Sequence, residues 1–192
     1  DLIVHMNVPY NLPNLIAEAA EKLRNRCGDS AVFEARLLLG MATGSDEAIY
    51  SHISIQLTEQ QIAQYNILIS QRCAGKPISR MRGWREFWSL RFYLNSATLD
   101  PRPESELLVE KAVSFAVSQQ KTLNQQLRLL DLGTGSGCLL LACLSELTHA
   151  TGVGIDINDQ AVIQARINAR SMNLEARSEF FVSNWFDGFE DN

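Results

Sequence analysis

The chain has 192 residues, of which 46% are hydrophobic and 20% charged, and its net charge at pH 7 is −5. This composition is typical of a globular protein with room for one large domain or two small ones. The acidic balance argues against non-specific nucleic-acid binding. There is no run of roughly 18 apolar residues that would span a membrane. We therefore expect a cytoplasmic protein that binds neither membranes nor nucleic acid directly.

The four cysteines and three histidines are scattered, without a CxxC pair or another metal-ligand spacing. We interpret the thiols as reduced and buried, and we expect no metal site. Residues 1–9 lack the basic and apolar segments of a signal peptide. We treat them as a leader outside the fold, which is partly vector-derived if the natural start is Met6.

Residues 10–82 carry apolar stripes at helical spacing, interrupted at Gly28-Asp29-Ser30 and again near Gly44. Thr58 and Gln61 have the spacing of a capping box, which predicts that a helix begins there. The segment therefore predicts a small helical bundle for partner recognition or scaffolding. The residues expected to face its core are Leu12, Leu15, Ile16, Ala19, Leu23, Ala31, Ala35, Leu38, Leu39, Ile62, Tyr65, Ile69 and Cys73.

Between residues 83 and 103 the periodicity changes from helix to strand. Every second residue from Trp88 to Leu94 is apolar, which predicts strand structure and a β-hairpin that links two domains. The sequence P-R-P-E-S-E (101–106) follows, and its two prolines fix an extended backbone. Its two glutamates then fall in the first turn of a helix, where acidic side chains suit the helix dipole.

Residues 104–192 alternate between strand and helix patterns. This alternation builds a parallel sheet with covering helices, and the expected class is therefore α/β. The expected strands are 127–132, 151–155 and 179–183, and the expected helices between them are 137–147 and 159–172.

The sequence D-L-G-T-G-S-G (131–137) directly follows the first of these strands. A dinucleotide fingerprint, G-x-G-x-x-G, requires a glycine at Cys138, so the spacing disfavours a nicotinamide dehydrogenase. The D-x-G-x-G-x-G pattern is instead the form seen in S-adenosylmethionine-dependent methyltransferases. This cofactor has no pyrophosphate and needs a bare backbone against which its ribose and methionine parts can lie. A glycine turn that serves only tight packing is the competing interpretation.

Polar residues at three successive strand ends complete the expected cofactor site. Asp131 would hold the loop or the ammonium group of the cofactor. Asp156 ends the second strand, where a carboxylate accepts both ribose hydroxyls. After the third strand, which lies beside the adenine in class I methyltransferases, Asn184 would bond the base edge. Trp185 would stack on the base or line its pocket, or else pack in the core. The expected cofactor-binding residues are Asp131, Gly133, Thr134, Gly135, Ser136, Gly137, Asp156, Asn184 and Trp185.

These motifs resemble the bacterial release factor glutamine methyltransferases, the HemK/PrmC family, over nearly the whole chain. The likeness rests on F-E-A-R-L-L-L (33–39), G-K-P-I (75–78), G-W-R-E-F-W (83–88), P-R-P-E-S-E, the glycine loop, Asp156 and N-W-F (184–186). P-R-P-E-S-E discriminates most, since related enzymes that act on a ribosomal-protein glutamine differ after P-R. The resemblance implies a monomeric S-adenosylmethionine-dependent enzyme that methylates the Gly-Gly-Gln glutamine of class I peptide release factors. Residues 10–82 would recognise the substrate, and residues 104–192 would form an incomplete Rossmann-like cofactor domain.

Two departures from the family pattern bear on this interpretation. The family has Asp where this chain has Asn184, and an amide would bind the cofactor with altered affinity. The family's acceptor motif, Asn-Pro-Pro-Tyr, follows a fourth strand, and no Asn-Pro-Pro occurs in the sequence up to its last residue, Asn192. The resemblance therefore implies that this motif lies beyond Asn192.

We accordingly assign no catalytic residue within the chain and expect this polypeptide alone to be inactive. Two alternatives remain. One is a methyltransferase for another protein glutamine, and the other is a non-catalytic S-adenosylmethionine-binding or adaptor protein.

A basic segment runs from Arg72 to Arg102, with seven arginines and lysines against two acidic residues. Such a charge run forms either a solvated face or a docking surface for an acidic partner.

Overall fold

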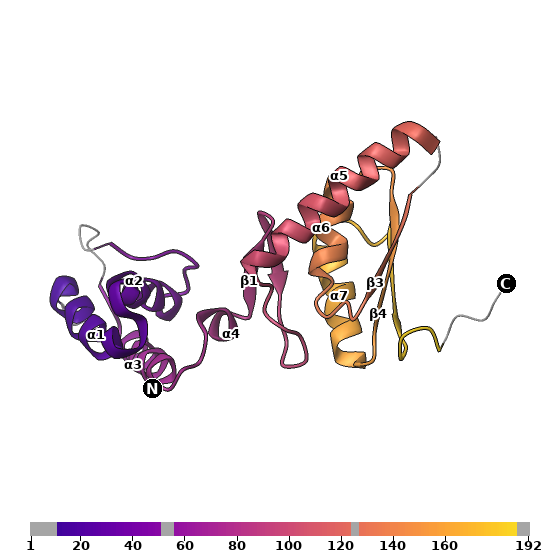
Figure 1. The fold of residues 1–192 in the computed structure, drawn as a ribbon. Helices are drawn as coiled ribbons and strands as arrows, with labels where there is room; N and C mark the ends of the chain where they lie inside the picture. Colours follow the sequence, from indigo (N-terminus) through magenta and orange to yellow (C-terminus); the bar gives the residue numbers. More distant parts are fainter. Residues whose placement is uncertain (1–10, 51–55, 124–126, 188–192) are drawn as a thin grey trace. The chain divides into compact units, whose positions relative to one another are not determined.

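The computed structural model describes residues 11–50, 56–123 and 127–187. The leader expected over residues 1–9 lies outside these ranges, and so does Asn192, the residue beyond which the acceptor motif is expected. The chain divides into two compact units, residues 1–82 and 83–192 (Figure 1). No helix within the described ranges is long and apolar enough to cross a membrane.

The first unit is helical, as expected. Its capping box is confirmed, because Gln61 N–H donates to Thr58 Oγ1 at 3.2 Å while Thr58 N–H donates to Gln61 Oε1 at 2.9 Å. Asn11 caps the first helix through a 3.3 Å bond from the N–H of Asn14. The elements are α1 (Leu12–Cys27), the 3₁₀ turn η1 (Gly28–Ser30), α2 (Ala31–Ala42), α3 (Glu59–Cys73) and α4 (Ile78–Arg82).

Most residues predicted to face the core of this bundle are buried, and Leu15 and Ile62 are half-buried. Tyr65 lies in the centre of the cluster and donates its hydroxyl to the carbonyl of Ala35 at 3.1 Å. The prediction for Cys73 is wrong, since this residue is exposed. Cys73 is the last residue of α3 and lies outside the hydrophobic cluster that the rest of the stripe joins.

The second unit combines a hairpin, a long helix and a parallel sheet. The three strands pair in the order β3-β4-β5, all parallel, with Asp131 opposite Gly154 and Gly154 opposite Phe180. The predicted strands and helices are confirmed to within one or two residues. The elements are β1 (Trp84–Phe87), β2 (Leu90–Tyr93), the 3₁₀ turn η2 (Pro103–Ser105), α5 (Glu106–Leu123), β3 (Arg128–Leu132), α6 (Cys138–Glu146), β4 (Thr151–Asp156), α7 (Asp159–Ser171) and β5 (Ser178–Val182).

The hairpin is present, but the single strand implied by the alternation from Trp88 to Leu94 is not. Trp88 and Ser89 form the two-residue turn between β1 and β2, each with a positive φ, 53° and 56°. Turns of this handedness match the strand twist but favour glycine or asparagine, which this sequence lacks at the turn. The apolar alternation therefore spans a turn that carries no ordinary turn signal.

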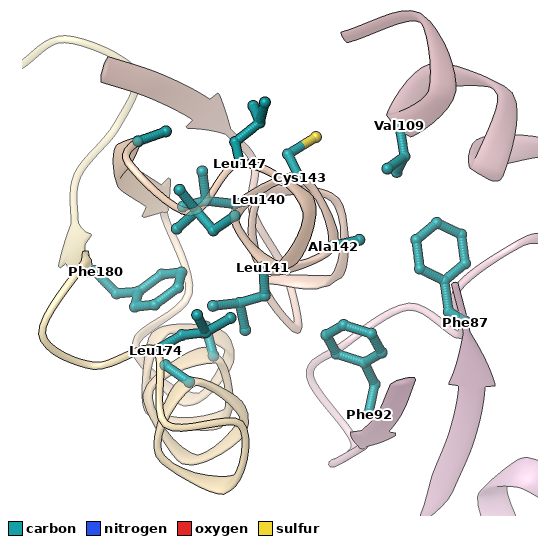
Figure 2. Close-up of a cluster of buried hydrophobic side chains, with 14 of the residues drawn as sticks. Phe87, Phe92, Val109, Leu140, Leu141, Ala142, Cys143, Leu147, Leu174 and Phe180 are labelled. Atoms are coloured by element: carbon teal, nitrogen blue, oxygen red, sulfur yellow. The ribbon is translucent and has the colours of Figure 1, made fainter. Parts of the chain in front are cut away.

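One hydrophobic cluster joins the hairpin to the helices and the sheet (Figure 2). Phe87 and Phe92, one from each hairpin strand, meet edge to face with ring centroids 6.1 Å apart. The helix α6 contributes Leu140 and Leu141, and Phe180 of β5 packs in the same cluster. This cluster fixes the strands whose carboxyl ends carry the expected cofactor residues.

Candidate functional site

A cavity of about 190 Å³ opens at the carboxyl ends of the three parallel strands. This is the edge at which open α/β sheets bind their ligands. Four of the residues expected to bind the cofactor, Gly133, Asp156, Asn184 and Trp185, lie in its lining. The cavity is lined by Leu132, Gly133, Ile155, Asp156, Ile157, Ser183, Asn184 and Trp185.

The glycine loop is fastened at its first turn to the neighbouring strand and to its own strand end. The N–H groups of Gly133 and Thr134 both donate to the carbonyl of Ile155 at 2.8 Å. Thr134 Oγ1 donates to Asp131 Oδ2 at 2.7 Å. Burial raises the pKa of the Asp131 carboxyl, the Thr134 bond opposes this shift, and the nearby Asp156 carboxylate adds to it. Asp131 therefore holds the loop, which is one of its two expected roles.

Asp156 fastens the second half of the loop. Its Oδ2 accepts the N–H of Gly135 at 2.8 Å, and its Oδ1 accepts the N–H of Asn158 at 2.9 Å. A carboxylate has about four acceptor positions, so these two bonds leave capacity for a ligand hydroxyl. The carboxylate lies in the cavity lining, at the strand end where a ribose is expected.

The three loop glycines serve different purposes. A side chain added to Gly133 or Gly135 would meet no atom within 4 Å, and Gly135 has a φ of 56° that L side chains rarely adopt. Gly137 instead faces the core, where an added Cβ would lie 3.2–3.3 Å from Leu141, Ala165 and Phe180. The first two glycines thus leave an open backbone surface, and the third permits tight packing.

Thr134 and Ser136 alternate with these glycines and point inward. Their exposed fractions are 5% and 2%, and Thr134 is committed to Asp131. Neither residue is in the cavity lining, and the Thr134 side chain supports the loop. A place for them or for Gly137 in the cofactor site stays a prediction that would involve backbone atoms.

The segment after β5 presents Trp185 to solvent, with 66% of the residue exposed and a φ of 54°. The side chain lies in the cavity lining and outside the hydrophobic cluster, so the core-packing alternative does not describe it. Asn184 Nδ2 donates to Asp187 Oδ2 at 3.0 Å. This bond uses the amide nitrogen of Asn184. Its side-chain oxygen can still accept a hydrogen bond, as an oxygen of the family's Asp would.

The basic segment is partly engaged within each unit. Arg72 forms an ion pair with Glu34 at 2.6 Å, and Arg82 donates to the carbonyl of Asp46 at 3.2 Å. The guanidinium of Arg91 lies 4.0 Å from the centroid of the Trp84 ring. These arginines have structural roles, and the ion pair with Glu34 neutralises the charge of Arg72.

Comparison with known proteins follows the same division of the chain. Residues 14–83 match the family described as the PrmC N-terminal domain, and residues 123–192 match a methyltransferase domain family. A release factor glutamine methyltransferase of Bradyrhizobium diazoefficiens is 40% identical over 167 residues, which are 86% of this chain and 56% of the relative. The chain is thus similar to the release factor glutamine methyltransferases of the PrmC family.

A second PrmC relative, the release factor glutamine methyltransferase of Buchnera aphidicola from Acyrthosiphon pisum, is 38% identical over 177 residues, 92% of this chain and 61% of the relative. The chain thus spans less than two thirds of the length of these two relatives. The methyltransferase match includes the glycine loop, Asp156 and the segment after β5. The resemblance inferred from the motifs is confirmed at the level of the family.

The expectation that the acceptor motif lies beyond Asn192 stays a prediction. The relatives are longer than this chain. Within the described residues, the sheet has three strands and ends at β5, so the fourth strand that would precede the motif is not among them.

Besides Leu132, Ile155 and Ser183 of the cavity lining, two further residues near the site were not anticipated from the sequence. Ile157 lies in the cavity lining and is 72% exposed, an unusual position for isoleucine. Asn168 is fully buried on the inward side of α7 and bonds the glycine loop. A polar residue in the buried stripe of an amphipathic helix was the available signal for Asn168.

Proposed function

We propose that this chain is part of an S-adenosylmethionine-dependent methyltransferase that modifies the glutamine side-chain amide of the Gly-Gly-Gln motif in class I peptide release factors. The observation that carries the cofactor assignment is the Asp156 carboxylate in a cavity beside the open backbone of the glycine loop. The PrmC relatives support a release factor glutamine as the substrate, since they are named release factor glutamine methyltransferases, and the family resemblance supplies the Gly-Gly-Gln motif.

The residues present fit S-adenosylmethionine. Gly133 and Gly135 offer a surface without side chains, Asp156 offers acceptors for hydroxyl groups, and Trp185 offers an exposed aromatic face at the same cavity. When bound, the cofactor supplies a methyl group already activated by its sulfonium. The cavity lining has no Lys or Arg among the described residues, which agrees with a ligand that carries no pyrophosphate.

The chain's own groups would bind and orient this donor. Asp156 would hold the ribose while it fixes the loop through Gly135, and Asp131 would support the loop through Thr134. Trp185 would cover the base, with Asn184 at its edge. A preorganised site of this kind contributes by holding the reacting groups in line.

The acceptor side of the reaction is not assigned to residues of this chain. A glutamine amide nitrogen is a weak nucleophile because its lone pair is delocalised into the carbonyl. Orientation and electrostatic stabilisation must therefore supply much of the catalysis. The family resemblance attributes this task to the Asn-Pro-Pro-Tyr motif, which is expected beyond Asn192.

Calorimetry with S-adenosylhomocysteine and with NADH tests the cofactor assignment. We expect the purified chain to bind S-adenosylhomocysteine and not NADH, and the reverse preference would refute a methyltransferase. The substrate assignment is tested with the complete product of the gene, by following radiolabelled methyl transfer to a class I release factor. A release factor whose Gly-Gly-Gln glutamine is replaced serves as the control and should take up no label.

A further inference from the structure

Asn168 is a fully buried amide in the inward stripe of α7. Its exposed fraction is 0%, and its neighbours on that stripe, Ala165 and Ala169, are small and apolar. Burying an amide in such surroundings opposes folding unless its donors and acceptor are all satisfied. The bonds that satisfy Asn168 therefore indicate why an amide occupies this position.

The side chain of Asn168 makes three hydrogen bonds to backbone groups of two other segments. Its Oδ1 accepts the N–H of Tyr93 at 2.9 Å, and its Nδ2 donates to the carbonyl of Tyr93 at 3.1 Å. The second Nδ2 hydrogen goes to the carbonyl of Ser136 at 2.9 Å. The amide thus pairs with Tyr93 as a strand residue would, and it joins the end of the hairpin to the glycine loop.

With Asn168 included, three consecutive residues of the glycine loop are held by three different elements. Thr134 is bonded to Asp131 of β3, and Gly135 is bonded to Asp156 of β4. Ser136 is bonded to Asn168 of α7, so removal of that amide would leave a buried carbonyl without its partner. The same helix holds the segment after the hairpin a second time, through a 2.7 Å bond from Asn95 Nδ2 to the carbonyl of Gln160.

The geometry points to Asn168 as a positioning residue for the cofactor site. It lies outside the cavity lining and acts by fixing the Ser136 carbonyl, and with it the loop backbone at Gly135. Because the same amide holds Tyr93, the end of the hairpin and the glycine loop open together. The effect on cofactor binding rests on the proposed function, whereas the coupled opening does not.

Hydrogen exchange and calorimetry on the chain test this role with Asn168→Ala and a matched control, Leu174→Ala. Leu174 is buried in the same cluster after the far end of α7, so its truncation destabilises the unit without touching the loop. In Asn168→Ala we expect the amides of Tyr93 and Gly135 to exchange at least about tenfold faster, with Ile155 and Phe180 unchanged. S-adenosylhomocysteine affinity should fall about tenfold. In Leu174→Ala the loop amides should not exchange faster than the other amides of the unit.

Equal acceleration of all amides in Asn168→Ala, or none, would overturn the inference. A second variant, Asn168→Asp, keeps the side-chain size and the acceptor for the Tyr93 N–H but removes both Nδ2 donors, to the carbonyls of Ser136 and Tyr93, and should accelerate exchange at the same two amides. Native-state exchange of the unsubstituted chain adds a measurement that needs no variant. The Tyr93 and Gly135 amides should open with the same free energy, and different opening free energies would contradict the coupling.

Failure of the unsubstituted chain to bind S-adenosylhomocysteine would refute the cofactor assignment. The exchange result would then decide this inference by itself.

Discussion

Asp156 combines two tasks in one carboxylate. It fixes the loop and the start of α7 through the N–H groups of Gly135 and Asn158, and it keeps acceptor capacity at the cavity. A ligand that bonds Asp156 therefore meets a group whose orientation is already set. Such preorganisation lowers the entropy lost on binding.

Replacing Asp156 with alanine should weaken S-adenosylhomocysteine binding at least tenfold. Hydrogen bonds to a charged group contribute about 1.5–3 kcal/mol, and a tenfold loss corresponds to about 1.4 kcal/mol. Part of the loss would come from the released Gly135 N–H. Calorimetry measures the effect, with Asp159→Ala as the control because that exposed acid lies in the first turn of α7. Unchanged affinity in Asp156→Ala would remove this residue from the site.

Asp131 should make the stability of the chain depend on pH. Its folded-state pKa is raised, mainly by burial, above the unfolded value of about 3.9, so ionisation opposes folding. The carboxyl favours folding below about pH 3.9 and loses this contribution as the pH rises through its folded-state pKa. Asp131→Asn keeps one acceptor oxygen for the two donors on this carboxyl, Thr134 and the Leu140 N–H, and it cannot ionise. Its stability relative to the unsubstituted chain should therefore be higher at pH 7 than at pH 3.5. Urea unfolding at both pH values measures this, and a relative stability that does not rise with pH would contradict it.

At the scale of residues, the position of a side chain could be predicted from the sequence where a strand end fixes it. Asp156 and Gly133 could be placed at the cavity because parallel strands present their carboxyl ends at one edge. Asn168 could not, because its partners are backbone groups 75 and 32 residues away. The inward direction of Ser136 is likewise set by tertiary packing, and local spacing does not encode it.

At the scale of elements, the hairpin shows how a turn can form without turn residues. Trp88 and Ser89 adopt a conformation that costs a non-glycine residue about 1–2 kcal/mol each. Tertiary bonds offset this cost, since Trp88 N–H donates to Glu106 Oε1 at 2.8 Å and its indole Nε1 donates to Glu146 at 2.7 Å. The turn is therefore specified by α5 and α6, which a local pattern cannot reveal.

Glu106 should accordingly contribute more to stability than Glu104, the other glutamate of the P-R-P-E-S-E sequence. Glu106→Ala removes the acceptor for the Trp88 N–H and should lower the free energy of unfolding by about 1–3 kcal/mol. Glu104→Ala, at an exposed position, should change it by less than about 0.5 kcal/mol. Urea denaturation followed by tryptophan fluorescence compares the two variants. Equal effects would show that the turn does not depend on Glu106.

At the scale of the whole molecule, the parallel sheet buries one face more fully than the other. Phe180 lies on the face that packs against α6 and α7, and the alternation of strand residues places Leu130 and Phe181 on the opposite face. Leu130 and Phe181 are 50% and 43% exposed, although parallel sheets are normally covered on both sides. Among the described residues β3 is also an edge strand.

A polypeptide of residues 1–192 should therefore self-associate, even though the whole protein is expected to be a monomer. Unpaired edge strands with apolar side chains pair readily with other chains, and a lysine at such an edge opposes this. Leu130→Lys should shift the polypeptide toward monomer in size-exclusion chromatography with light scattering. Val32→Lys, at a 43% exposed position of the helical unit, controls for added charge and should change little. A monomeric unsubstituted polypeptide would contradict the prediction.

The same polypeptide should bind S-adenosylhomocysteine without methylating a release factor. Binding draws on Asp156, the glycine loop and Trp185, which are all present, whereas transfer also requires the glutamine amide to be held in line with the methyl group. No Asn-Pro-Pro occurs in these 192 residues to provide that hold. A radiolabelled methyl-transfer assay with saturating S-adenosylmethionine measures turnover, after calorimetry has shown that the preparation binds ligand. Clear turnover on the Gly-Gly-Gln glutamine would mean that residues within this chain orient the acceptor. The attribution of that role to a motif beyond Asn192 would then be wrong.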